Sequence, residues 1–146
     1  MASIFDAAHY ILDTQGPMSS MKLQKLCFYA QFWSYGWMHK PLFEDEFRAW
    51  ASGPVNEELY RYIKEQLYDG AMATKELLKS KCTISLSAEE KSVVDKVLHY
   101  YGNKSPEELH QSSIAEYPWI SSYGGYGTHN IITKEKFQEA HQALRN

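Results

Sequence analysis

The sequence predicts a mainly α-helical protein, a compact set of five to seven helices around one buried central helix, with a small two-stranded antiparallel β ribbon. The stretch at residues 21–37 would be apolar almost all the way round a helix, and such a helix is buried on most sides. Serines also stand directly before several helix-like stretches, where a serine side chain caps a helix N-terminus. These serines are Ser3, Ser19 or Ser20, Ser87 and Ser105.

The first two helices follow from their apolar faces. Ser3 precedes a helix whose apolar residues within 4–12 fall on one face,. Gly16-Pro17 ends that helix, because neither residue favours a helix interior,. The central helix comes next. Its main apolar stripe comprises Leu23, Leu26, Cys27, Ala30, Trp33 and Trp37, and Tyr29, Phe32 and Tyr35 cover much of the remaining surface.

The ribbon is predicted from two short stretches. In residues 47–51, Phe47, Ala49 and Ala51 alternate with Arg48 and Trp50, which is the period of two typical of a strand,. Residues 82–86 contain Thr83 and Ile84, which favour strands, so we expect them to pair with 47–51,. Gly53-Pro54 follows the first strand, and the missing donor of a proline does no harm in the first turn of a helix. We therefore expect the third helix to start at Pro54.

The C-terminal half is divided by local signals. Ser87 with Glu90, and Ser105 with Glu108, have the spacing of capping boxes and predict two helix starts,. A short helix is predicted within 71–80, and a final helix after Thr133. The residues expected to face inward in these two helices are Met72, Leu77 and Leu78, and Phe137, Ala140, His141 and Leu144.

Length and composition limit the class of protein. A chain of 146 residues predicts a single domain over 1–146,. The net charge of −3 offers no basic excess for a nucleic-acid partner,. There is no signal-peptide pattern and no run near the about eighteen apolar residues of a membrane helix. We therefore expect a soluble, cytoplasmic protein with no membrane partner, and the unpaired spacing of its two cysteines fits a reducing compartment,.

No catalytic or metal-binding motif stands out. The glycines at 124, 125 and 127 lack the strand and helix that frame a phosphate-binding loop, so a surface loop is favoured,. The six histidines are scattered without the spacing of a zinc site,. For His110 we favour a hydrogen-bonding or capping role over catalysis. The sequence therefore predicts no metal, no cofactor and no enzymatic activity.

Several residues are candidates for contact with a partner. Lys25 lies on the largely buried helix, where a lysine must extend its amine to solvent, pair with a carboxylate or face a partner. Its polar stripe is either the one solvated edge of the helix or a contact surface. The other members of this stripe are Lys22, Gln24 and Gln31. Trp50 and Trp119 have two similar interpretations, because each is either a core residue, which we favour, or a partly exposed anchor.

The order and spacing of short motifs add a resemblance. Within residues 21–60 they are Leu23-Gln24-Lys25-Leu26, Tyr29-Ala30-Gln31, Pro41-Leu42-Phe43, Ala49-Trp50, Gly53-Pro54-Val55 and Leu59-Tyr60. Leu109-His110 followed by Pro118-Trp119 resembles a later motif. Together they resemble the family called Panacea, the SocA-like antitoxin domain of bacteria and phages. Residues 117–130, rich in serine, glycine and tyrosine, do not align with it.

The resemblance implies a protein-binding function. Panacea domains are the neutralising part of toxin–antitoxin pairs, and the SocA-like type is also linked to delivering a toxin to a Clp protease. The expected partners are a cognate toxin and a Clp-type protease. The partner-binding candidates are Lys25, Tyr29, Arg48, Trp50, Tyr60 and Trp119. Two alternatives stay open: a phage or mobile-element enzyme that uses His110 and the tyrosine-rich loop, and a nucleic-acid-binding regulator that uses Lys22, Lys25, Arg48 and Arg61.

Overall fold

The computed structural model describes the backbone of residues 1–145 and the side chains of residues 1–143. The described residues form eight α-helices, one more than the upper limit expected, together with one short 3-10 helix and three strands. The elements are α1 (Ile4–Gln15), α2 (Ser20–Met38), β1 (Phe47–Trp50), β2 (Gly53–Val55), α3 (Glu57–Gln66), α4 (Lys75–Leu78), η1 (Lys79–Lys81), α5 (Ala88–Tyr101), α6 (Pro106–Ser113), α7 (Tyr117–Ile120), β3 (Asn130–Ile132) and α8 (Lys134–Arg145).

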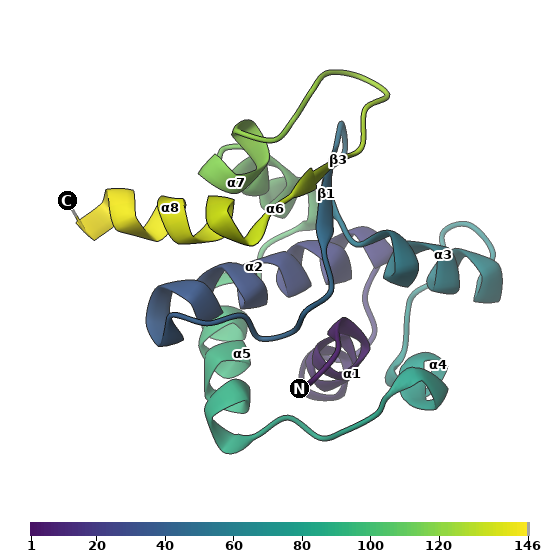
Figure 1. Ribbon diagram of the computed structural model, residues 1–146. Coiled ribbons are helices and arrows are strands. Elements are labelled where there is room, and N and C mark those ends of the chain that lie inside the picture. The colour runs from purple at the N-terminus through teal and green to yellow at the C-terminus, as the bar shows by residue number, and fades with distance from the viewer. Residues whose placement is uncertain (146) are drawn as a thin grey trace.

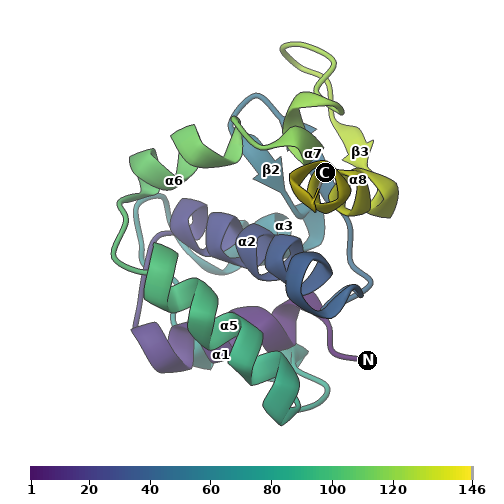
Figure 2. The ribbon, with the colours of Figure 1, turned by 90° about the vertical axis from the view of Figure 1, so that its left-hand side faces the viewer.

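Helix α2 is the central element, as its sequence predicts. Figures 1 and 2 show it running through the middle of the molecule, with α1 and α5 on one side and α6, the sheet and α8 on the other. Ser19 caps its N-terminus by accepting a hydrogen bond from the N–H of Lys22. His39 ends it in the left-handed conformation, at φ 59°. Each of its first four turns contributes buried side chains, so α2 lies at the centre of the core.

The polar residues of α2 are buried as well. Gln24 is 2% exposed, and its amide bonds both the N–H and the C=O of Asn56, each at 2.9 Å. Gln31 is 4% exposed and bonds the N–H of Leu42 and the C=O of Phe43, each at 2.7 Å. Gln24 and Gln31 therefore fit neither of the two interpretations of the polar stripe, a solvated edge or a contact surface, because both are buried, whereas Lys22 is half-buried. The two glutamines supply hydrogen bonds to extended backbone that has few strand partners of its own.

The sheet differs from the predicted ribbon. Strand β1 forms as expected, but it lies between β2 and β3 and pairs antiparallel with both. Residues 82–86 are not a strand. Instead, the carboxylate of Asp6 accepts hydrogen bonds from Thr83 N, Thr83 Oγ1 and Ile84 N, at 2.8, 3.0 and 3.3 Å. Because this carboxylate satisfies the N–H groups of Thr83 and Ile84, the segment runs beside α1 and takes no part in the sheet.

The start of the third helix also differs from the prediction. Gly53 and Pro54 belong to β2, and α3 begins at Glu57. Asn56 is the cap, because its side chain accepts a hydrogen bond of 2.8 Å from the N–H of Leu59. An asparagine cap satisfies a free N–H of the first turn, whereas a proline at the first position only removes one. The helix therefore begins three residues after Pro54.

Other local predictions are confirmed or corrected. Both predicted capping boxes form, at Ser87 with Glu90 and at Ser105 with Glu108. The short helix within 71–80 exists as α4, but Met72 is 54% exposed and not inward-facing. Trp119 belongs to helix α7 and not to a loop. The predicted inward position of Leu144 falls outside the described side chains. None of the described helices has the length and apolar character needed to cross a membrane.

The central position of α2 predicts the effect of a cavity. Leu26 is fully buried on α2, so Leu26→Ala should lower the free energy of unfolding by roughly 2–5 kcal/mol. Urea denaturation followed by circular dichroism measures the change. Met21, on the same helix but 43% exposed, is the matched control, and Met21→Ala should cost less than about 0.5 kcal/mol. Equal stability of Leu26→Ala and wild type would show that α2 is not the core helix.

Candidate partner-binding surface

The hairpin formed by β1 and β2 carries a cluster of aromatic side chains on its outer face. Trp50 stacks on the ring of His129, with centroids 4.4 Å apart and an interplanar angle of 13°. It also meets the ring of Tyr60 edge to face at 5.0 Å. The indole N–H of Trp119 donates a 2.8 Å hydrogen bond to the C=O of Trp50. We call Arg48, Trp50, Tyr60, Trp119 and His129 the Trp50 surface; all five side chains are half-buried or exposed.

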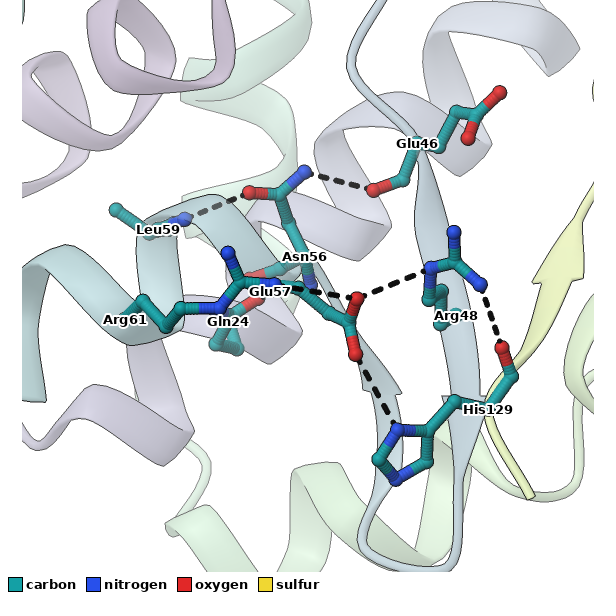
Figure 3. A network of polar contacts seen from close by, with 8 residues as sticks. All are labelled: Gln24, Glu46, Arg48, Asn56, Glu57, Leu59, Arg61 and His129. Carbon is teal, nitrogen blue, oxygen red and sulfur yellow. Dashed lines mark hydrogen bonds and ion pairs between the residues drawn. The ribbon is translucent and has the colours of Figure 1, made fainter.

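Glu57 at the start of α3 holds the charged part of this surface. Figure 3 shows three basic side chains around its carboxylate. Arg48 Nε and His129 Nδ1 lie 3.2 and 3.3 Å from its two oxygens, and Arg61 Nη2 lies 3.7 Å away. Arg48 also donates a 2.9 Å hydrogen bond to the C=O of His129. Strand β1, helix α3 and the segment before β3 are thereby joined, and the guanidinium of Arg48 is held in one orientation.

The aromatic surface continues onto α7 and the segment that follows it. Trp119 stacks on Tyr123 with centroids 4.4 Å apart. Ile120 and Tyr126 are 55% and 94% exposed. Large apolar side chains that gather at the surface mark sites of contact with other molecules. Helix α7 and the segment after it therefore add apolar area beside the hairpin.

Trp50 has one polar atom without a partner. Its indole Nε1 is buried and makes no hydrogen bond within the described part of the chain. An unpaired buried donor costs about 1–3 kcal/mol, and such groups are uncommon in folded proteins. The packing of Tyr60 and His129 on the indole ring offsets this cost. The Trp50 side chain is therefore held in the surface by ring contacts, and its indole N–H contributes no hydrogen bond within the described part of the chain.

Lys25 lies below the hairpin and not at its surface. The side chain is only 1% exposed. Its amine donates a 3.3 Å hydrogen bond to the C=O of Pro54, the one partner it has among the described residues. Gly53 has φ 105°, a conformation that favours glycine,, and a Cβ there would come within 2.9 Å of this amine. Burial lowers the pKa of Lys25 to about 8.

Tyr29 is also a core residue. Its ring stacks on Tyr101 with centroids 4.0 Å apart. Its hydroxyl lies 2.7 Å from Ser112 Oγ and 2.8 Å from Glu116 Oε2, so it connects α2 to α6 and to the start of α7. Burial raises the pKa of Tyr29 and also that of Glu116. Of the six predicted partner-binding residues, the structure gathers Arg48, Trp50, Tyr60 and Trp119 and places Lys25 and Tyr29 beneath them.

Sequence reasoning missed His129 and the role of Glu57. Glu57 lies in the first turn of α3, and nothing in its local sequence indicates contacts with Arg48 and His129. His129 lies in the segment that does not align with the family, next to a strand too short to give a periodic pattern. His110 has the hydrogen-bonding role expected of it, because its Nδ1 lies 3.0 Å from the C=O of Ser52 in the hairpin turn.

The surface offers no evident site for an ion. Among the described residues, no group of three or more His, Cys, Asp or Glu side chains is arranged to hold a metal. The carboxylate of Glu57 is surrounded by the cationic side chains of Arg48 and Arg61 and by His129. These contacts orient the arginines and leave the aromatic rings as the main contact area. The arrangement has apolar area at its centre and charge at its rim, as the interfaces between proteins do.

The depressed pKa of Lys25 predicts a pH dependence of stability. An unfolded lysine has a pKa near 10.5, whereas the folded value is about 8. Between these values the unfolded chain binds the proton and the folded chain does not, so stability rises with pH. Relative to Lys25→Met, the wild type should gain on the order of 1–2 kcal/mol between about pH 7 and pH 9.5. Urea denaturation of both proteins at the two pH values measures this change in the free energy of unfolding. Parallel pH profiles of the two proteins would contradict the prediction.

Comparison with known proteins places this geometry in a family. The model of the family described as antitoxin SocA-like, Panacea domain matches residues 23–120, which is more than half of the chain. The matched region includes most of α2, the hairpin, α3 and all of α7. No curated protein and no solved structure matches the chain. The family model covers both the core helix and most of the Trp50 surface, and this chain therefore belongs to the SocA-like antitoxin family, the Panacea domain.

Proposed function

We propose that this protein is an antitoxin that binds a toxin protein directly through the Trp50 surface. The observation that carries the proposal is the convergence of Arg48, Trp50, Tyr60 and Trp119 from three separate elements onto one face. All four lie within the region that matches the antitoxin family. Tryptophan, tyrosine and arginine are the residues that most often dominate the binding energy of protein interfaces. A surface built from them is suited to bind another protein.

The proposed mechanism is steric capture. The toxin buries the rings of Trp50, Tyr60 and Trp119, and its active surface is covered while it is bound. Arg48 is held by Glu57 before the toxin arrives, and a pre-ordered side chain loses less entropy on binding. The partly exposed guanidinium groups of Arg48 and Arg61 then favour a toxin with carboxylates at the rim of its contact surface.

Lys25 and Tyr29 take a supporting role in this proposal. Lys25 holds the C=O of Pro54 beneath the hairpin. Tyr29 holds α6 and the start of α7, the helix that carries Trp119. Substitution of either residue is expected to lower binding through loss of fold, so neither is a useful probe of direct contact.

The second part of the proposal concerns the fate of the toxin. We propose that the bound toxin is passed to a Clp-type protease, a role that the sequence resemblance to the SocA-like type implies. This role requires a second surface that stays accessible while the toxin occupies the hairpin. Degradation of the toxin by a reconstituted Clp protease with and without this protein tests it, and equal rates would remove the hand-over step from the proposal.

The binding proposal predicts the effect of three substitutions. Arg48→Glu, Trp50→Ala and Tyr60→Ala should each weaken toxin binding by more than about tenfold, because loss of one anchor residue costs about 2 kcal/mol or more. The measurement is titration calorimetry with the toxin encoded beside this protein, together with rescue of growth on co-expression. Tyr100→Ala and Lys79→Glu, on exposed residues of α5 and η1, are the controls and should bind like wild type.

The variants also separate binding from stability. Each variant is first compared with wild type by circular dichroism and thermal melting, and only folded variants are used. If folded Arg48→Glu, Trp50→Ala and Tyr60→Ala all bind and rescue like wild type, the Trp50 surface is not the binding site. If no toxin encoded beside this protein binds it or is neutralised by it, the antitoxin function itself is refuted.

A further inference from the structure

A second candidate site is a groove in front of the sheet, bounded by the segment that leads into β1 and by the junction of β3 with α8. Its volume is about 550 Å³. In Figure 1 the segment that leads into β1 passes below α2, and the junction of β3 with α8 lies above it. The buried rings of Phe43, Phe47 and Phe137 form part of its wall. None of the residues of the Trp50 surface lines the groove.

Tyr35 places an unpaired hydroxyl in this groove. The residue is 5% exposed, and its ring stacks on Phe137 with centroids 5.4 Å apart. Its hydroxyl makes no hydrogen bond within the described part of the chain, although the side chain lines the groove. Glu44 and Glu135 line the same groove, and burial, followed by the charges of these two residues, raises the pKa of Tyr35. A buried hydroxyl that faces a groove can both donate and accept a hydrogen bond to an occupant.

The charge of the groove is mainly negative. Glu44, Glu46 and Glu135 line it and form no ion pair among the described residues. Asp45 lines it too, but its carboxylate accepts a 2.9 Å hydrogen bond from the N–H of Ile4. The positive groups beside the groove are the side chain of Lys134 and the amino group of Met1. Unpaired carboxylates therefore outnumber cations, and the groove attracts positive charge.

An edge strand borders the groove. Strand β3 pairs with β1 on one side only. Because Pro54 has no N–H, its partner Ala49 directs its hydrogen bonds to Asn130 on the other side. In an antiparallel sheet, successive residues of a strand direct their N–H and C=O groups to opposite sides. The N–H and C=O of Ile131 therefore point to the outer edge of β3, away from β1. Ile131 is 40% exposed, and no second strand pairs with this edge of β3 in the described sheet.

We propose that the groove binds an extended segment of a partner protein that carries a lysine or arginine. The segment lies along the outer edge of β3 and exchanges backbone hydrogen bonds with Ile131. Its cationic side chain enters between Glu44 and Glu135 and donates a hydrogen bond to the hydroxyl of Tyr35. Addition of a strand at a free edge is a common mode of peptide recognition, in which pockets for alternate side chains give specificity.

The observations favour a peptide cation over a metal ion. No set of three potential metal ligands is gathered in the described residues. A single flexible cation on a long side chain needs only two carboxylates and one hydroxyl, which is what Glu44, Glu135 and Tyr35 provide. This proposal does not rest on toxin binding by the Trp50 surface, because the groove uses other residues and other chemistry.

The test uses a fluorescein-labelled pentapeptide, Val-Arg-Val-Lys-Val, and its neutral counterpart, Val-Gln-Val-Gln-Val. Binding to the full chain is measured by fluorescence anisotropy at low ionic strength. The variants are Tyr35→Phe, which removes only the hydroxyl, and the double variant Glu44→Gln/Glu135→Gln. The control is Glu65→Gln/Glu107→Gln, which makes the same change of net charge at exposed sites on α3 and α6.

The expected result is binding of the basic peptide and at least about tenfold weaker binding of the neutral one, the size of one charge-assisted hydrogen bond. The groove double variant should lose about tenfold in affinity for the basic peptide, Tyr35→Phe should lose severalfold, and the control should match wild type. Equal affinity of the groove variant and the charge-matched control would show non-specific attraction and overturn the proposal. So would equal binding of the two peptides, or no binding of either.

Discussion

The two buried glutamines of α2 are the interactions on which the remaining structure depends. Gln31 bonds the backbone at Leu42 and Phe43, and Gln24 bonds both backbone groups of Asn56. The chain between α2 and α3 contains only two short strands, and a buried backbone group without a partner costs about 1–3 kcal/mol. Apolar packing holds α2 in the core but does not fix which backbone atoms lie beside it. The two amides fix that choice.

This constraint sets the position of the Trp50 surface. Gln24 holds the backbone of Asn56, and the side chain of Asn56 bonds the C=O of Glu46 and the N–H of Leu59 (Figure 3). The entrance to β1, the exit of β2 and the start of α3 are therefore tied at one residue. With both ends of the hairpin fixed, Arg48 and Trp50 can point only outward from the face that Phe47 and Ala49 turn to the core.

The parts of the fold that sequence predicts are those whose partners lie close in the chain. Both partners of each capping box are three residues apart, so Ser87 with Glu90 is visible without a structure. Contacts across long stretches are not visible in this way. Thr83 and Ile84 have the composition of a strand, yet Asp6, more than 70 residues earlier, satisfies their backbone. For the same reason β3, with three residues, and its neighbour His129 could not be predicted.

The six candidate residues divide along the same line. The alternation that places Arg48 and Trp50 on the same face of β1 is local, so the sequence contains it, but the core position favoured for Trp50 is wrong because Trp50 is only half-buried. The burial of Lys25 depends on a turn that passes over α2 about 30 residues later, and a helix pattern does not contain that information. A lysine on an apolar helix was therefore assigned to a solvated edge or a partner contact, whereas a backbone carbonyl accepts its hydrogen bond.

The sheet places the two proposed binding sites side by side. Arg48 of the Trp50 surface and Ile131 of the groove face each other as a cross-strand pair. The ends of β1 are only about 10 Å apart at the rise of an extended strand, whereas a stable interface covers about 800 Å² on each partner. One partner of ordinary size would therefore cover both sites. The aromatic half would supply most of the affinity, and the acidic half would select the orientation in which a basic segment meets Glu44 and Glu135.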